Sequence, residues 1–155
     1  MVHTGHALAQ RGHNVTILAD RAAHVEGDPL ATWGLERPPS LDFRLCPLSW
    51  RPGAGAWFRW NVVQWADAAG RDSIVYAREM KYVQLCPRPL PVVFEAHDNA
   101  RMVARDRGEE PGPVEALERA TLARSAALVA NCGGAMGALD EDYGTAQPPL
   151  RRPLV

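Results

Sequence analysis

Short apolar runs that alternate with helical stretches are the feature that most constrains the fold of this chain. The runs are rich in valine, leucine and isoleucine, and each is too short for a typical helix. They cover residues 15–19, 41–45, 73–77, 92–96 and 127–131. Strands that alternate with helices form parallel sheets with right-handed crossovers. We therefore predict an α/β fold, a Rossmann-like doubly wound parallel sheet in three α/β/α layers.

Helices are predicted between these runs from apolar spacing and from end signals. Gly12 follows one of them at the position of a C-cap glycine, and Pro113 stands at the start of another, where proline is favoured. The predicted helices cover residues 3–11, 56–69, 78–85, 113–125 and 133–143. Residues 21–40 contain several glycines and prolines, so we predict a long loop there.

The first predicted helix has no strand and no glycine-rich turn before it. In a doubly wound sheet that strand is central and buried on both faces, and its absence would expose apolar neighbours. We therefore expect residues 1–146 to be a Rossmann-like domain that lacks its first strand. Residues 147–155, which are rich in proline and arginine, are predicted to be the start of a linker or a tail.

Composition excludes several classes of protein. The chain has 155 residues, 46% of them hydrophobic, which is enough for one domain with a core. Its formal net charge of -1 argues against a nucleic-acid partner. Its 3 cysteines form no Cys-x-x-Cys pair, which is typical of a protein in a reducing compartment. No apolar run approaches the ~20 residues that a membrane-spanning helix needs. We expect a cytoplasmic protein, and peripheral contact with the inner face of the membrane is left open.

Polar side chains at the ends of two neighbouring predicted strands indicate a ligand site. Arg78 and Glu79 follow one strand directly, and Glu95 and His97 end the next. The carboxyl ends of parallel strands meet at one edge of a sheet, so these side chains are expected to converge. Arg78 is predicted to bind a phosphate or carboxylate, or to pair with Glu95. Glu95 points to the same side as His97 and is expected to support it.

A third strand end supplies weaker candidates. Asn131 and Gly133 lie at a strand-to-helix corner, where free N–H groups and the positive end of a helix favour an anion. The favoured alternative is that the glycines only allow a tight turn. In the helix over residues 56–69, the aromatic side chains could stack on sugars or touch lipid, but their helical spacing favours core packing; they are Trp57, Phe58, Trp60 and Trp65.

Two further patterns are interpreted as coincidences. Glu110 and Glu118 form a Glu-x7-Glu pattern, but they lie at a helix start that proline and glycine interrupt. His3 and His6 share a helical face but lack a third metal ligand, so no metal site is predicted. The chain contains no Gly-x-Gly-x-x-Gly motif and no phosphate-binding P-loop.

Several segments resemble a known enzyme family. The stretch His-Ala-Leu-Ala-Gln-Arg-Gly-His-Asn-Val-Thr-Ile-Leu, residues 6–18, is similar to the first helix and second strand of retaining family-4 glycosyltransferases of the GT-B architecture. The segments at 74–79, 92–98 and 127–131, and a helix that ends in Asp-Tyr-Gly at 142–144, have the order and spacing of that family's N-terminal domain. The resemblance covers nearly the whole chain.

The resemblance implies a function for this chain. Such enzymes hold the acceptor in an N-terminal Rossmann-type domain and the nucleotide-sugar in a C-terminal one. This chain would be the acceptor half, with a sugar or glycolipid acceptor, no cofactor and no metal, and it would be inactive without the missing C-terminal domain.

The resemblance also assigns roles to the predicted site. His97 would be catalytic: its ring would bind a sugar hydroxyl, and its backbone carbonyl would face positive charge at the anomeric carbon. The residues expected to bind substrate are Arg78, Glu79, Glu95, Asn131 and Gly133.

Two other functions remain open from the sequence. In a dinucleotide-binding Rossmann domain, Asp20 would hold a ribose hydroxyl, although the glycine fingerprint is absent. In a non-catalytic interaction module, a partner would complete the fold and cover the exposed apolar surface.

Overall fold

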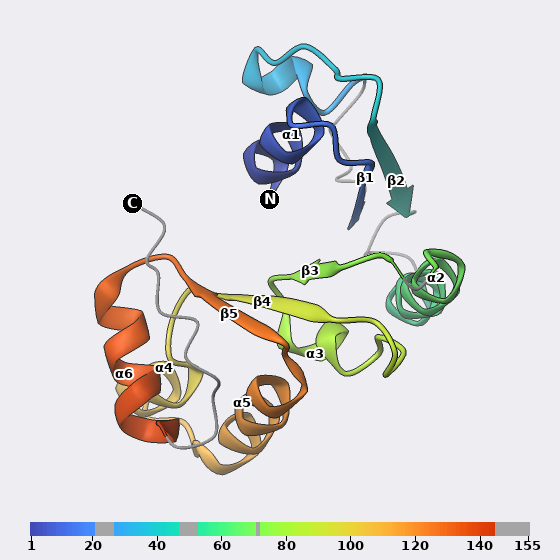
Figure 1. The fold of residues 1–155 in the computed structure, drawn as a ribbon. Helices are drawn as coiled ribbons and strands as arrows, with labels where there is room; N and C mark the ends of the chain where they lie inside the picture. Colours follow the sequence, from blue (N-terminus) through green and yellow to red (C-terminus); the bar gives the residue numbers. More distant parts are fainter. Residues whose placement is uncertain (21–26, 47–52, 71, 145–155) are drawn as a thin grey trace. The chain divides into compact units, whose positions relative to one another are not determined.

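The computed structural model describes residues 1–20, 27–46, 53–70 and 72–144, and the chain divides into two compact units. Unit 1 is Met1–Asn61 and unit 2 is Val62–Val155. Parallel strands alternate with helices along the chain, as the sequence predicts (Figure 1). The tail predicted over residues 147–155 lies outside the described residues.

Unit 1 pairs two parallel strands. It contains the helix α1 (Val2–Gln10), the strands β1 (Val15–Asp20) and β2 (Leu41–Cys46), and the short 3-10 helix η1 (Ala31–Trp33). The register runs from Val15 opposite Leu41 to Asp20 opposite Cys46. A small core forms on α1 and the two strands and contains Ala9, Ile17, Leu30 and Leu41.

Helix α1 ends as its sequence predicts. Gly12 has a φ of 90°, in the left-handed region that favours glycine. Its N–H donates to the carbonyl of Ala9, and the N–H of His13 donates to the carbonyl of Leu8. These two bonds form a Schellman motif, which satisfies carbonyls that the helix end leaves free.

Unit 2 contains a sheet with the strand order β3-β4-β5, all parallel. The strands are β3 (Val75–Ala77), β4 (Val92–Ala96) and β5 (Ala127–Ala130). Helices α3 (Met80–Val83), α4 (Ala100–Asp106), α5 (Gly112–Arg124) and α6 (Gly133–Tyr143) lie on one side of this sheet (Figure 1). The core between them contains Ala77, Val83, Cys86, Val92, Phe94, Ala96, Leu122, Leu128, Leu139 and Tyr143.

Side chains of β4 alternate strictly between the two faces of this sheet. Val92, Phe94 and Ala96 are buried in the core, whereas Val93 and Glu95 are half-buried on the other face. This alternation follows from the two-residue period of a strand. Glu95 is therefore held away from the apolar core, on the face where a carboxylate keeps access to polar partners.

The parallel α/β class is as predicted, and the described strands pair within a two-stranded and a three-stranded sheet. Helix α4 was not predicted. Its signal is Asn99, a favoured N-cap residue, whose side-chain oxygen accepts from the N–H of Met102 at 2.9 Å.

The aromatic side chains of α2 (Ala54–Ala68) correct a second prediction. Trp57 is 47% exposed and Trp60 is 52% exposed, and the two rings stack with centroids 5.1 Å apart. Core packing was therefore the wrong interpretation for both. The buried stripe of α2 instead includes Phe58, Val62 and Ala66, spaced four residues apart as one helical face requires.

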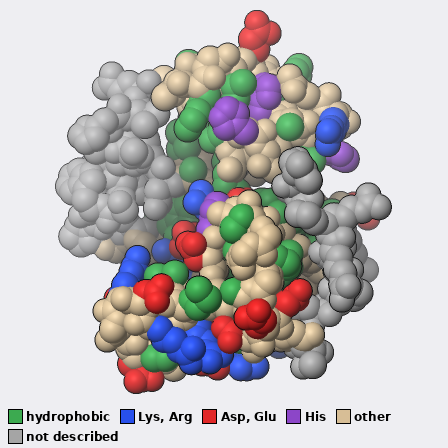
Figure 2. Space-filling model, turned by 90° about the vertical axis from the view of Figure 1, so that its left-hand side faces the viewer, with side chains coloured by type: hydrophobic (Ala, Val, Ile, Leu, Met, Phe, Trp, Pro, Cys, Tyr) green, Lys and Arg blue, Asp and Glu red, His purple; other side chains and the backbone are tan. Residues whose placement is uncertain are grey.

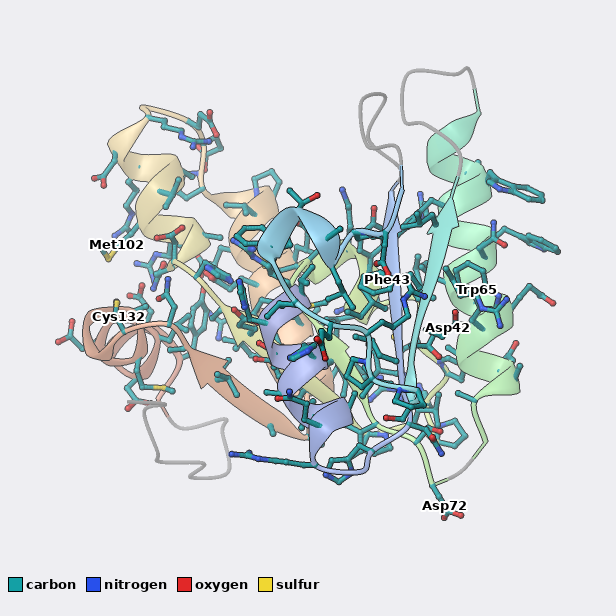
Figure 3. The ribbon with its side chains drawn as sticks, turned by 90° about the horizontal axis from the view of Figure 1, so that it is seen from above. Asp42, Phe43, Trp65, Asp72, Met102 and Cys132 are labelled. Atoms are coloured by element: carbon teal, nitrogen blue, oxygen red, sulfur yellow. The ribbon has the colours of Figure 1, made fainter. Side chains whose placement is uncertain are left out.

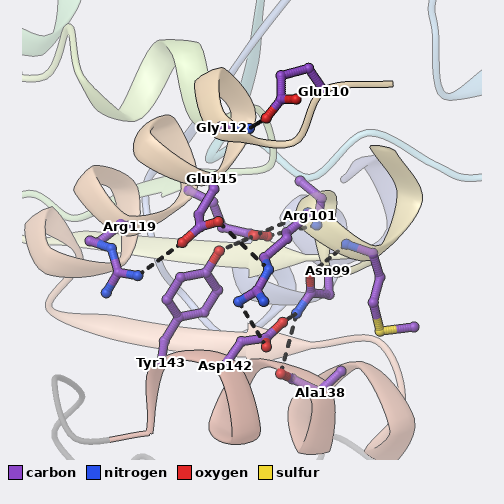
Figure 4. Close-up of polar contacts among 12 residues, drawn as sticks. Asn99, Arg101, Glu110, Gly112, Glu115, Arg119, Ala138, Asp142 and Tyr143 are labelled. Carbon is purple, nitrogen blue, oxygen red and sulfur yellow. Dashed lines mark hydrogen bonds and ion pairs between the residues drawn. The ribbon is translucent and has the colours of Figure 1, made fainter. Parts of the chain in front are cut away.

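A buried carboxylate joins three helices of unit 2 (Figure 4). Glu118 of α5 is 2% exposed and accepts the N–H of Ala100 at 2.8 Å and the hydroxyl of Tyr143 at 2.7 Å. Arg101 donates to Asp142 at 3.0 Å in the same cluster. Glu118 therefore satisfies N–H groups at the start of α4 that the helix itself leaves without partners.

Candidate functional site

Three polar side chains of unit 2 surround the imidazole ring of His97. His97 Nδ1 lies 3.3 Å from Arg78 Nη2 and 3.4 Å from Asn131 Nδ2. His97 Nε2 lies 2.8 Å from Glu95 Oε1. Arg78 and Asn131 are exposed, whereas the side chains of His97 and Glu95 are 28% and 15% exposed. The ring therefore has one edge toward solvent-exposed donors and the other toward a mostly buried carboxylate.

The parallel register explains why residues so far apart in sequence meet. Ala77 pairs with Phe94, and Ala96 pairs with Ala130, so the residues that follow each strand lie at the same edge of the sheet. Arg78 follows β3, His97 follows β4 and Asn131 follows β5. The N–H of Asn131 also donates to the carbonyl of Ala96 at 3.2 Å, which ties the ends of β4 and β5 together.

The predicted ion pair between Arg78 and Glu95 does not occur among the salt bridges of the described residues. The imidazole of His97 contacts both side chains instead, one at each ring nitrogen. The angle at Nε2 is not that of a hydrogen bond, so the short contact to Glu95 is a close approach of polar atoms. Glu95 Oε2 is also buried without a hydrogen bond from the described residues.

Tyr76 belongs to this cluster, and the sequence interpretation missed it. Burial, together with the neighbouring Glu95 carboxylate, raises the pKa of Tyr76 to about 12. Tyr76 pairs with Val93 in the register, and Glu95 lies two residues further along on the same face. The two-residue alternation of β3 and β4 was the signal that could have found it.

Glu79 is not brought to the histidine. It stands before the first residue of α3 without capping the helix, and its carboxylate lies 3.9 Å from Lys81 Nζ. Both side chains are more than half exposed, so this pair contributes little to stability.

The backbone between β5 and α6 has free space around it at Gly133. Cys132 is the N-cap of α6, with its Sγ 3.4 Å from the N–H of Ala135 (Figure 3). Gly133 and Gly134 do not have positive φ, so the turn does not need glycine for its backbone. A β-carbon added at Gly133 would meet no atom within 4 Å. The tight-turn interpretation therefore does not explain these glycines, and a ligand could approach the backbone closely here.

The other candidates occupy structural positions. Glu118 is the buried helix clamp described above, whereas Glu110 is exposed, so the pair does not form a donor site. His6 Nε2 lies 2.9 Å from the carbonyl of Glu36, and His3 contacts the ring of Trp33. Within the described ranges, no group of three histidine, cysteine or acidic residues could hold a metal ion. Asp20 is the last residue of β1.

The free thiols of the described residues differ in environment. Cys86 is buried in the core of unit 2, and burial raises the pKa of its thiol, which makes the thiol a poor nucleophile. Cys132 is exposed.

The face of the molecule drawn in Figure 2 carries both acidic and basic side chains, and several of the basic ones gather together. A shallow depression of the surface runs along α5 and contains none of the predicted site residues; it is lined by Gly112, Glu115, Ala116, Arg119, Ala120 and Ala123. None of the helices that the structure describes is both long enough and apolar enough to span a bilayer.

Comparison with known proteins gives one match. The model of the family Glycosyltransferase Family 4 matches residues 1–151, which is nearly the whole chain. No curated protein and no solved structure matches the chain.

Proposed function

Because this chain belongs to glycosyltransferase family 4, we propose that it is the acceptor-side domain of a retaining glycosyltransferase. The enzyme transfers a sugar from a nucleotide-sugar donor to a hydroxyl group of a sugar or glycolipid acceptor. Residues 1–146 form the domain, and residues 147–155 begin the linker to a second domain that binds the nucleotide-sugar. This chain alone does not complete the reaction.

The cluster around His97 is the observation that carries the proposal. Its ring is held from both sides by polar groups, at the edge of a parallel sheet where ligands bind in α/β proteins. An imidazole can bind a sugar hydroxyl, and the adjacent backbone carbonyl can face the positive charge that develops at the anomeric carbon. His97 is therefore the catalytic residue of the proposal.

Arg78 is the proposed contact for an anionic group of the acceptor. Its side chain is exposed, and only one of its N–H groups is engaged by the ring of His97 in the described contacts. A guanidinium fork can bind a phosphate or carboxylate with two parallel bonds. Asn131 and the open backbone at Gly133 lie at the end of the neighbouring strand and extend the proposed acceptor site. Glu79 is a peripheral member of this site.

Location and partners are also proposals. Free Cys86 and Cys132 support a cytoplasmic location, where thiols stay reduced. The exposed Trp57 and Trp60 are suited to peripheral contact with the inner face of a membrane, because tryptophan is amphipathic and favours such interfaces. Neither a metal nor a cofactor is part of the proposed reaction.

The first experiment measures sugar transfer by the natural full-length gene product with and without the change His97→Ala. We expect the variant to lose transfer by about 100-fold or more, because the ring that holds a sugar hydroxyl in the transition state is removed while the backbone carbonyl stays. Binding of the nucleotide-sugar should weaken much less than transfer does, because the second domain of the proposal holds the nucleotide and the variant loses only the contact of the ring with a sugar hydroxyl. Unchanged transfer would refute the role of His97.

A binding assay on the 155-residue chain separates the proposal from its alternatives. We expect this chain to bind neither UDP-glucose nor GDP-mannose in isothermal titration calorimetry. Tight binding of NAD would favour the dinucleotide-binding function instead, and an enzyme without any sugar transfer would favour an interaction module.

A further inference from the structure

We propose that Glu95 and Tyr76 fix the His97 ring in the tautomer with its proton on Nε2, which leaves Nδ1 as a hydrogen-bond acceptor. The inference deepens the proposed function, on which its meaning for substrate binding rests. In a glycosyltransferase, the ring would then accept a hydrogen bond from a substrate hydroxyl and would not donate one. Tyr76 is a positioning residue in this proposal, since it acts on the ring through Glu95.

The contacts at Nδ1 of His97 indicate that this nitrogen carries no proton. Arg78 Nη2 lies 3.3 Å from Nδ1 and can only donate, because a guanidinium has no acceptor. The amide nitrogen of Asn131 lies 3.4 Å from the same atom. A proton on Nδ1 would set donor against donor at both contacts. The lone pair of Nδ1 therefore faces Arg78 and Asn131.

The contact at Nε2 of His97 favours the same tautomer, with the proton on Nε2. Glu95 Oε1 lies 2.8 Å from Nε2, and an ionised carboxylate can only accept. Without a proton on Nε2, two lone pairs would face each other at that distance. Glu95 therefore favours Nε2–H even though the bond angle is poor, and the mostly buried position of its side chain strengthens this preference.

In this proposal, Tyr76 positions the carboxylate of Glu95. It lies on the same sheet face as Glu95 and is half-buried there, in the neighbouring strand β3. Glu95 in turn raises the pKa of the Tyr76 phenol, so the two groups interact. A phenol that keeps its proton can donate to a neighbouring carboxylate, and the shared sheet face brings the two groups near each other. The order along this face is therefore Tyr76, Glu95, His97 and then the exposed donors Arg78 and Asn131.

The test is nuclear magnetic resonance of the imidazole nitrogens in the ¹⁵N-labelled 155-residue chain, at about pH 8.5, where ordinary histidines are neutral. Long-range proton–nitrogen couplings distinguish the two tautomers directly. The His97 signal is assigned by its loss in His97→Gln. We expect His97 to show the Nε2–H tautomer alone, whereas the chain unfolded in urea should show a mixture. A folded chain in which His97 is protonated on Nδ1 would overturn the proposal.

Two variants test the positioning residues. Glu95→Gln offers an amide donor to Nε2 and should convert a large part of the ring population to the Nδ1–H tautomer. Tyr76→Phe should shift the population in the same direction by a smaller amount. The matched control is Tyr143→Phe, the same change at a tyrosine that bonds Glu118, and it should leave the His97 signal unchanged. Variants at Glu95 and Tyr76 that leave the tautomer unaltered would refute their role.

This experiment needs no substrate, so its failure is distinct from failure of the proposed function. A mixed tautomer together with His97-dependent sugar transfer would refute only the positioning by Glu95 and Tyr76. A single Nε2–H tautomer together with sugar transfer that is unaffected by His97→Ala would refute only the catalytic role.

Discussion

At the scale of single residues, the chemistry of this chain is concentrated on one face of a short strand. Glu95 lies in β4 and His97 follows that strand, and Tyr76 lies on β3 on the same sheet face as Glu95. Burial and the neighbouring Glu95 raise the pKa of the Tyr76 phenol. The effects of these side chains can be measured separately, because conservative substitutions exist for each.

Tyr76 should make stability depend on pH under alkaline conditions. The pKa of its phenol is raised from about 10 to about 12 in the folded chain, so the folded state keeps the proton longer than the unfolded state does. This contribution is complete below about pH 10 and is lost as the pH rises to about 12. Urea unfolding between these values should show stability falling less steeply in Tyr76→Phe than in the unaltered chain. Parallel pH profiles would contradict this.

Glu118 should be far more important for stability than its partner in the Glu-x7-Glu pattern. Glu118→Gln turns one acceptor into a donor that faces backbone N–H groups, and unsatisfied buried groups cost about 1–3 kcal/mol. The matched control Glu110→Gln changes an exposed carboxylate and should change the free energy of unfolding by less than about 0.5 kcal/mol. Urea denaturation measures both, and equal effects would show that Glu118 is not a clamp.

At the scale of elements, helix ends and strand ends carry most of the specific interactions. Asn99 caps α4 and Glu118 binds the N–H groups at its start. Arg124, in the last turn of α5, donates to the carbonyls of Pro87 at 2.7 Å and Leu90 at 2.9 Å, which holds the proline-rich approach to β4. These contacts hold the segments before and after β4, the strand that His97 follows.

The start of α6 offers a test that separates stability from binding. Gly133 has ordinary helical backbone and open space around it, so Gly133→Ala should stabilise the chain by up to about 1 kcal/mol. If an acceptor anion approaches the backbone at this corner, the same change should weaken its binding several-fold in the full-length enzyme. Thermal unfolding measures the first effect and the KM for the acceptor measures the second. A strong loss of stability would show that the glycine is needed for folding.

At the scale of the whole molecule, charge and composition set how the chain behaves in solution. Its formal net charge is -1, its sequence pI is near 6.5, and Trp33, Trp57 and Trp60 are all about half exposed or more. Proteins with little net charge and exposed apolar groups tend to associate, because repulsion between molecules is weak.

Self-association should therefore be strongest near pH 6.5 and weaker at about pH 8.5, where the net charge is more negative. Light scattering at matched concentration and ionic strength measures it. The double variant Trp57→Ser and Trp60→Ser should reduce association at pH 6.5, whereas Trp65→Ser, at a half-buried tryptophan of the same helix, should reduce it less. Scattering that does not vary with pH would rule out net charge as the cause.

Much of the fold was predictable from local pattern. Each of the predicted strands exists, because short runs of apolar or alternating side chains suit a strand better than a helix, and Gly12 ends α1 as a C-cap glycine does. Helix α4 was missed because its seven residues are mostly polar or small and its main signal is the single N-cap Asn99. The exposed Trp57 and Trp60 were misjudged because helical spacing defines a face but does not say which face is buried.

The sequence by itself determined the parallel α/β class, the family, and the edge at which Arg78, Glu95 and His97 stand. These follow from local periodicity and from the common direction of parallel strands. Only the tertiary structure decided which groups lie close together: the imidazole lies between Arg78 and Glu95, Tyr76 shares the sheet face of Glu95, and Glu79 pairs with Lys81. The reason is physical, because contact depends on strand register and on packing between distant segments, which no local pattern specifies.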